Sequence, residues 1–169
     1  VIRAHRCASG MIPQSSENDE LNALGRSRGG YTTKIHVLCD GRGTLLGITA
    51  TGGQRHESTE FEKLLANCEL SLHRYDNRPK AIAGDKGYSS NAIRQSLKDL
   101  RIEPVIGSKS NESGNEPFDR EAYRDRNIVE RLIGWLKESR RVATRYDKLT
   151  CSYLAFVQLA AMRRLIKLL

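Results

Sequence analysis

The sequence predicts a mixed α/β fold in which a sheet is flanked by helices. Three observations predict this class: two alternating apolar segments joined by a glycine-containing turn, two later short apolar segments that adjoin helical patterns, and two C-terminal segments with apolar residues at helical spacing. A length of 169 residues suffices for a sizeable core, so we expect a single globular unit.

The first part of the chain predicts a polar segment, a loop and a hairpin. Residues 9–24 are polar and lead into the glycine-rich basic stretch 25–30, which we interpret as a flexible loop. Residues 33–40 alternate as a strand, residues 40–43 have hairpin-turn chemistry, and residues 44–53 return as a second strand. We therefore expect an antiparallel hairpin.

The remainder of the chain predicts helices that alternate with short strands. Thr59 and Glu62 have the spacing of a capping box ahead of an apolar helical pattern. The expected elements are a helix over 58–70, a short buried strand over 80–88, a helix over 89–100, a strand over 103–107, and helices that start near Arg120 and Thr150. The predicted order is β-β-α-β-α-β-α-α.

The charge of the chain predicts an anionic partner. The formal net charge is +8, and residues 119–169 carry 12 Lys or Arg against 6 Asp or Glu. Basic balance alone does not distinguish nucleic acid from acidic lipid. The apolar tail over 153–169 is interrupted by Gln158, Arg163, Arg164 and Lys167, so it predicts an amphipathic packing helix, with no membrane partner.

Cysteine usage and the N-terminal residues indicate a reducing cytoplasm. Cys7, Cys39, Cys68 and Cys151 are far apart and form no C-x-x-C pair, so neither a zinc ribbon nor a disulfide framework is indicated. No secretory signal opens the chain. We expect a protein of a reducing compartment.

Four polar residues share one side of the helix predicted after Arg120. Tyr123, Arg126, Glu130 and Lys137 fall within an arc of about 60°. The stripe should flank the buried face that Leu132 and its apolar neighbours form. A solvated surface row, with an Arg126–Glu130 pair worth a few tenths of a kcal/mol, would explain the same pattern.

Two carboxylates are candidate metal ligands. Asp85 follows a short apolar strand, and the C-terminal edge of a sheet is a common place for sites in α/β folds, although a turn-forming Asp beside Gly87 is the alternative. Glu130 lies next to an apolar helix face and needs a cation or hydrogen bonds once it is partly buried. Carboxylates from separate elements hold Mg²⁺ and leave positions for phosphate oxygens and water, which suits phosphoryl transfer.

The spacing Y-x2-R-x3-E-x6-K of the helix stripe resembles the signature around the glutamate of DDE transposases from bacterial insertion sequences. Four blocks are similar to those of the insertion-sequence-five family, from Gly25 onward: GRSRGGYTTKIHVLCD, GQRHES, AGDKGYSS and RRVATRYDKL. The resemblance implies a ribonuclease-H-like catalytic domain over 25–169, in its C-terminal portion, with residues 1–24 as a truncated first strand and polar segment. It also implies cleavage and transfer of DNA strands with Mg²⁺, or Mn²⁺ in its place.

The resemblance assigns roles to individual residues. Asp85 is similar to the second acid of the triad and Glu130 to the third, both as metal ligands. The residues expected to contact DNA are Tyr123, Arg126, Lys137, Arg26, Arg28, Arg140 and Arg141. For Arg126 a DNA phosphate is favoured over Glu130 as the partner. The implied partners are the ends of an insertion sequence and its target DNA, bound by a homodimer or larger assembly associated with the nucleoid.

The sequence departs from the family at its first acid. The family pattern has an Asp-Ser-Thr block shortly before a stretch like VIRAHR, and here the chain starts at Val1. Asp19 and Asp40 do not replace it, because the first is in the polar segment and the second is in the hairpin turn. We expect this chain alone to be inactive. Two origins would explain the missing acid: the chain is joined to an upstream-frame product by ribosomal slippage, or it is a degraded copy. The alternative function is that of a noncatalytic DNA-binding or regulatory fragment.

Overall fold

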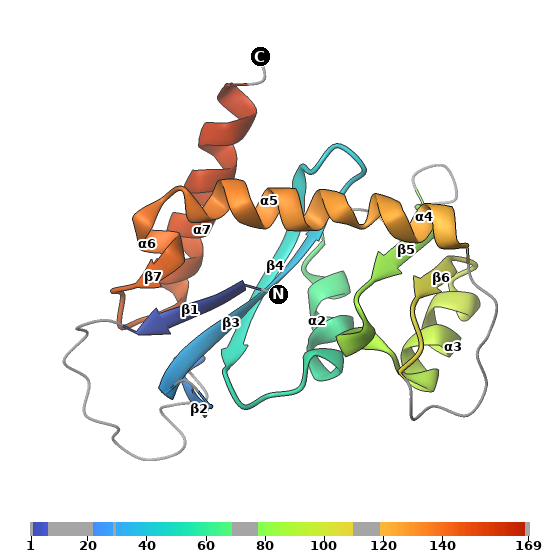
Figure 1. Cartoon of the computed structure of the whole chain (residues 1–169), viewed down its shortest axis with the longest axis horizontal. Helices are drawn as coiled ribbons and strands as arrows, with labels where there is room; N and C mark the ends of the chain where they lie inside the picture. Colours follow the sequence, from blue (N-terminus) through green and yellow to red (C-terminus); the bar gives the residue numbers. More distant parts are fainter. Residues whose placement is uncertain (1, 7–21, 29, 69–77, 110–118, 168–169) are drawn as a thin grey trace.

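The computed structural model describes residues 2–6, 22–28, 30–68, 78–109 and 119–167, which form a mixed α/β structure (Figure 1). The strands are β1 (Ile2–Arg6), β2 (Gly25–Ser27), β3 (Gly30–Cys39), β4 (Leu45–Gly52), β5 (Ala81–Gly84), β6 (Glu103–Ile106) and β7 (Thr144–Arg145). The 3₁₀ turns are η1 (Glu57–Glu60) and η3 (Lys86–Tyr88). The α-helices are α2 (Phe61–Ala66), α3 (Asn91–Asp99), α4 (Arg120–Asp125), α5 (Asn127–Lys137), α6 (Arg140–Ala143) and α7 (Thr150–Ile166). The predicted α/β class is confirmed.

The larger sheet is built around β3. The predicted hairpin is confirmed, since β4 pairs antiparallel with β3 from Thr33 to Cys39. β1 pairs antiparallel with the other edge of β3, and β7 pairs parallel with β1. The hairpin turn closes because Oδ1 of Asp40 accepts hydrogen bonds from the amides of Arg42 and Thr44, while Gly43 adopts a φ of 79°.

A second sheet contains β5 and β6, which run parallel, so the described residues form two sheets where the sequence predicted one. A cavity of about 370 Å³ separates them. Its lining includes residues 37–39 of β3, residues 81–83 of β5, and Arg126, Ile128 and Val129 of the helical arm formed by α4 and α5. β5 is consequently not the buried strand that we predicted, because Ala81 and Ala83 are exposed.

Two local predictions from sequence are wrong. Residues 25–27 are not a loop but the strand β2, which pairs with β3 and packs so closely that a β-carbon on Gly53 would lie 3.0 Å from the Gly25 carbonyl oxygen. Thr59 does not cap a helix. Its hydroxyl donates to the carbonyl of His56 at 2.8 Å, and α2 begins after Glu60 without a side-chain cap, because residues 57–60 form a 3₁₀ turn.

Some predicted segments extend beyond the residues that the structure describes. The polar segment predicted over 9–24 falls outside them except for its last three residues, of which Ala23 and Leu24 are buried. Asp19 and residues 69–70 of the helix predicted over 58–70 also fall outside. Residues 2–6, where the resemblance implies a truncated first strand, form the strand β1.

Two apolar cores hold the helices against the sheets. The first joins α5, α6 and α7 to β3 and consists of Ile35, Leu132, Leu136, Val142, Tyr153, Val157 and Ala161. The second joins α2 and α3 to β5 and β6 and consists of Phe61, Leu65, Ile82, Ile93, Leu97, Ile102 and Ile106. Full burial of one such side chain contributes about 1.5–3 kcal/mol, so these cores fix the helices relative to the sheets.

The C-terminal helix α7 packs as predicted. Tyr153, Val157 and Ala161 recur every four residues on the buried face, and Arg163 and Lys167 are exposed. None of the helices in the described part of the chain has the length and apolar composition that a bilayer crossing requires. Cys39, Cys68 and Cys151 are free thiols.

Candidate active site

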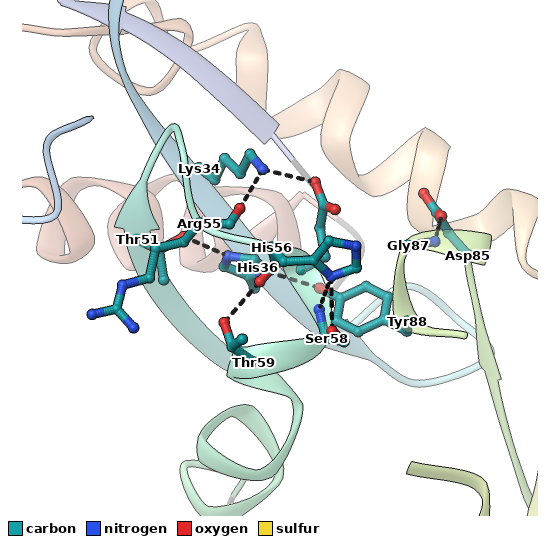
Figure 2. A network of polar contacts seen from close by, with 11 residues as sticks. Lys34, His36, Thr51, Arg55, His56, Ser58, Thr59, Asp85, Gly87 and Tyr88 are labelled. Carbon is teal, nitrogen blue, oxygen red and sulfur yellow. Dashed lines mark hydrogen bonds and ion pairs between the residues drawn. The ribbon is translucent and has the colours of Figure 1, made fainter. Parts of the chain in front are cut away.

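Asp85 lies at the C-terminal edge of the second sheet, directly after β5. Its side chain is exposed, and Oδ1 accepts a hydrogen bond of 2.6 Å from the amide of Gly87, so the carboxylate caps the turn η3 (Figure 2). The turn-forming role considered from sequence is therefore real. The hydrogen bond from Gly87 occupies one oxygen of Asp85 and fixes the orientation of the carboxylate.

The helix α4 brings Tyr123 to the same edge. α4 packs against β5 and β6, and a β-carbon on Gly107, the residue after β6, would lie 3.4 Å from the Tyr123 hydroxyl oxygen. The same point lies 3.5 Å from Cε of Lys86, which follows Asp85. Because Gly107 has no side chain, the tyrosine approaches the turn that bears Asp85.

Arg126 and Glu130 continue the stripe along the helical arm. Arg126 separates α4 from α5 but keeps helical φ and ψ values of −50° and −25°. The stripe residues on the two helices therefore stay on one side of the helical arm. Its guanidinium lies 5.2 Å from the centre of the Tyr123 ring and forms an ion pair of 2.9 Å with Glu130. The side chain of Arg126 is 26% exposed and that of Glu130 is 58% exposed. Tyr123 and Arg126 are half-buried and Glu130 is exposed, so the structure shows the Arg126–Glu130 pair of the solvated row that the sequence also allowed.

The other residues predicted to contact DNA lie elsewhere on the fold. Lys137 is exposed at the end of α5, roughly 21 Å along the helix axis from Tyr123. Arg140 and Arg141 are exposed on α6, where Arg141 pairs with Asp147 at 3.2 Å. Arg26 is exposed on β2, and Arg28 is exposed after it. These basic residues are therefore distributed over separate parts of the fold.

A polar network under η1 was not anticipated from sequence (Figure 2). The buried side chain of Lys34 on β3 forms an ion pair of 3.1 Å with Oε1 of Glu57 and donates to the carbonyl of Arg55 at 2.5 Å. His36, two residues along the same strand, contacts the Tyr88 hydroxyl and the Thr51 hydroxyl, both at 2.9 Å. This face of the sheet is polar yet buried.

The pKa values in this network follow from burial and charge. Burial raises the pKa of Tyr88, so its hydroxyl stays protonated beside Nδ1 of His36. Burial alone would also raise the pKa of Glu57, but the hydrogen bond and charge of Lys34 outweigh it, and the pKa of Glu57 is lowered. Glu57 is consequently ionised at neutral pH.

Glu57 and Asp85 both lie close to Gly87. A β-carbon on Gly87 would lie 3.1 Å from Oε2 of Glu57 and 3.3 Å from Oδ1 of Asp85. Carboxylate oxygens are the ligands that Mg²⁺ prefers in proteins. Sequence reasoning did not select Glu57, although it lies in the block GQRHES. Across the described ranges, no three or more His, Cys, Asp or Glu side chains are grouped to hold a metal, so Glu130 does not complete such a group here.

The stability of the fold is expected to decrease between pH 7 and pH 4.5 because of His36. Burial lowers the pKa of His36 from 6.5 to about 4, although the nearby charge of Glu57 opposes the shift. In this window the unfolded state binds a proton that the folded state excludes, so stability present above pH 6.5 is lost as the pH falls, by about 2 kcal/mol. Urea unfolding at both pH values measures the loss. The variant His36→Gln should show a smaller difference between the two pH values, and an equal difference would contradict the assignment.

Comparison with known proteins identifies related chains. A family model described as a transposase DDE domain matches residues 22–166. A relative from Burkholderia cepacia, described as a transposase for insertion sequence element IS402, is 31% identical over 142 residues, which cover 82% of this chain and 64% of the relative. A relative from Brucella ovis, described as a transposase for IS6501, is 26% identical over 130 residues, which cover 76% of this chain and 94% of the relative. The chain thus spans less than two thirds of the IS402 relative, and no solved structure matches it significantly.

Proposed function

The chain belongs to the transposase DDE domain family, and from this we propose that it is the C-terminal portion of an enzyme that binds insertion-sequence DNA and catalyses metal-dependent strand cleavage and transfer. The observation that carries the proposal is the exposed carboxylate of Asp85, oriented by the Gly87 amide at a sheet edge beside the helical arm with the Tyr-Arg-Glu-Lys stripe. The family match over residues 22–166 supports it.

Asp85 and Glu130 are the proposed metal ligands, with Glu57 close to the first. When bound, Mg²⁺ would activate water or a 3′-hydroxyl and stabilise the leaving oxygen. Asp85 supplies an oriented carboxylate. Glu130 pairs with Arg126 in the structure, so a metal at Glu130 would leave the guanidinium of Arg126 able to hold a DNA phosphate with two hydrogen bonds.

The proposed ribonuclease-H-like fold has a single mixed sheet. The cavity between the two described sheets supports this fold, because it lies where a further strand would connect them. β1 pairs with β3 as far as Ile2 opposite Ile35. A strand that continued β1 in this register would run along residues 36–39 of β3 and fill the cavity that residues 81–83 of β5 also line. It would join the two sheets and would be the source of the first acid.

A reconstitution experiment tests the proposed function. Joining residues 1–169 to a segment with an Asp-Ser-Thr block ahead of Val1 should produce Mg²⁺-dependent cleavage at the ends of the insertion sequence, whereas residues 1–169 alone should not cleave. Cleavage of end-labelled duplex DNA measures both. If the joined protein binds these ends but never cleaves them, the catalytic proposal is wrong.

The second candidate function is a noncatalytic DNA-binding or regulatory fragment. It is favoured by the exposed basic residues of α6 and β2 and by the finding that no three-acid metal group occurs among the residues that the structure describes. Such a fragment would bind DNA without metal, and Glu130→Gln would leave the affinity unchanged. A requirement for Mg²⁺ in binding would count against it.

Both functions predict that Lys137 contributes to DNA affinity through a phosphate. Lys137→Ala is expected to weaken binding to duplex DNA about threefold to tenfold and to reduce the slope of log affinity against log salt by about 1. Fluorescence anisotropy over a series of salt concentrations measures both quantities. Lys63→Ala, which removes an exposed lysine of α2, is the matched control and should change neither. An affinity that does not vary with salt would contradict phosphate contact.

A further inference from the structure

A basic groove runs along the second half of α7, where the end of α5 and the short helix α6 pack against it (Figure 1). It consists of two hollows of about 380 Å³ and 280 Å³. Both hollows are lined by Ser139, Ala160 and Arg163, so they adjoin, and we call them together the α7 groove. The charged residues that line it are Glu138, Arg140, Arg141, Arg163, Arg164 and Lys167. Because five of these six side chains are cationic, the groove attracts anions.

Two of the five cations are fixed by contacts within the fold. The guanidinium of Arg164 lies 3.5 Å from the centre of the Trp135 ring. The guanidinium of Arg141 lies 4.0 Å from the centre of the Phe156 ring and pairs with Asp147. Stacking on an aromatic ring is favourable for a guanidinium, so packing accounts for both arginines. They also hold two positive charges at fixed positions in the groove.

The other three cations, Arg140, Arg163 and Lys167, serve no such purpose. Their side chains are exposed, and none forms a hydrogen bond or an ion pair with the residues that the structure describes. α7 contains no Asp or Glu between Thr150 and Ile166, so no neighbouring acid on the helix balances Arg163. An accumulation of like charge disfavours the compact state unless an anionic partner offsets it. These three side chains are therefore suited to an anionic ligand.

The spacing of Arg163 and Lys167 fits a polyanion with closely spaced charges. The two residues are one helical turn apart, about 6 Å along the axis of α7. One strand of duplex DNA carries a phosphate for about every 3.4 Å of its axis, so two such cations can meet two phosphates of one strand. Lys137, already expected to contact a phosphate, directly precedes Glu138 of the groove lining.

We propose that the α7 groove binds the phosphate backbone of duplex DNA, with Arg163 and Lys167 as the main contacts and Arg140 beside them. The inference rests on the proposed function and adds to it a contact surface on a helix that the sequence predicted only to pack. Since phosphates carry no sequence information, the groove would set the position of the DNA on the protein and not the choice of sequence.

DNA binding by the full 169-residue chain tests the inference without relying on cleavage. The double variant Arg163→Gln with Lys167→Gln is expected to weaken binding to a fluorescein-labelled duplex of mixed sequence about 10-fold to 100-fold. The slope of log affinity against log salt should fall by about 2, because two phosphate contacts are lost. Fluorescence anisotropy over a series of salt concentrations measures both quantities.

Two control variants separate a contact in the groove from a general effect of charge. Lys63→Gln with Lys80→Gln removes the same net charge from exposed lysines outside the groove and should leave affinity and slope unchanged. Arg163→Lys with Lys167→Arg keeps both positive charges and should retain most of the affinity. The amide spectrum of each variant shows whether the fold is kept.

The possible outcomes distinguish the inference from the function on which it rests. If Lys137→Ala weakens binding while the groove variant binds as tightly as the wild type, the groove is not a DNA contact and the proposed function stands. If the wild-type chain does not bind duplex DNA, both are overturned. A groove variant that loses affinity for a labelled polyglutamate peptide but not for DNA would assign the groove to an acidic protein, which also overturns the inference. A loss of DNA affinity in the groove variant alone supports it.

Discussion

Glu130→Gln is expected to abolish DNA cleavage by the chain once it is joined to the segment that supplies the first acid. The substitution preserves the shape of the side chain but removes the charge that would hold a divalent cation, and a loss of several kcal/mol of transition-state stabilisation lowers the rate by about three orders of magnitude. Single-turnover cleavage of end-labelled DNA in Mg²⁺ measures the rate. Asp85→Asn should have an effect of the same order.

A stability argument and one control variant distinguish this loss from a loss of stability. The ion pair between Glu130 and Arg126 is largely exposed on the glutamate side, so its removal costs at most about 1 kcal/mol and leaves the protein folded. Glu121→Gln changes an exposed carboxylate in the first turn of α4 and should leave cleavage unaltered. Full cleavage by Glu130→Gln would show that Glu130 is not a metal ligand.

Arg145→Met is expected to have the largest effect on stability. Arg145 is 1% exposed, and its guanidinium donates to the carbonyls of Asn22, Asp147 and Lys148 and to the Thr33 hydroxyl, at distances between 2.7 Å and 2.9 Å. Methionine keeps the apolar part of the side chain but leaves these buried acceptors without their donor. We expect a loss of about 3–5 kcal/mol in the free energy of unfolding, measured by urea unfolding.

Arg141→Met is the matched control for this prediction. Arg141 lies four residues before Arg145, its side chain is 52% exposed, and it pairs with Asp147, whose side chain is 10% exposed. Its loss should lower the free energy of unfolding by less than that of Arg145, because its guanidinium is largely in solvent and has one such partner. If Arg145→Met were as stable as Arg141→Met, the network around Arg145 would not hold the segments that it joins.

Local patterns in the sequence were sufficient for several elements of the fold. The hairpin of β3 and β4 follows from alternation on both sides of a turn with Asp40 and Gly43, and α7 follows from apolar residues every three or four positions. The capping box at Thr59 failed because the chain forms a 3₁₀ turn there. The strand β2 was missed because its three residues, rich in glycine and arginine, carry no strand signal of their own and pair only because β3 lies beside them.

Some residues of the candidate site were also predictable from sequence, and others were not. Asp85 and the stripe from Tyr123 to Lys137 were selected from sequence, because a strand end and a helix periodicity are local features and because the family motif has fixed spacings. Their roles in binding metal and DNA remain proposals. Glu57 was missed since no spacing relates it to Asp85, and only the packing of η1 against η3 brings the two carboxylates to Gly87.

The sequence by itself determined the α/β class, the hairpin, the helix faces and membership of the transposase family, because each depends on residues a few positions apart or on blocks of fixed spacing. Only the tertiary structure decided which polar residues are buried. Lys34 and His36 lie on the polar face of an alternating strand, and they are buried because η1 and Tyr88 cover that face. Arg145 bonds to the hydroxyl of Thr33, 112 positions away, a contact that exists only when the sheet and α7 are assembled.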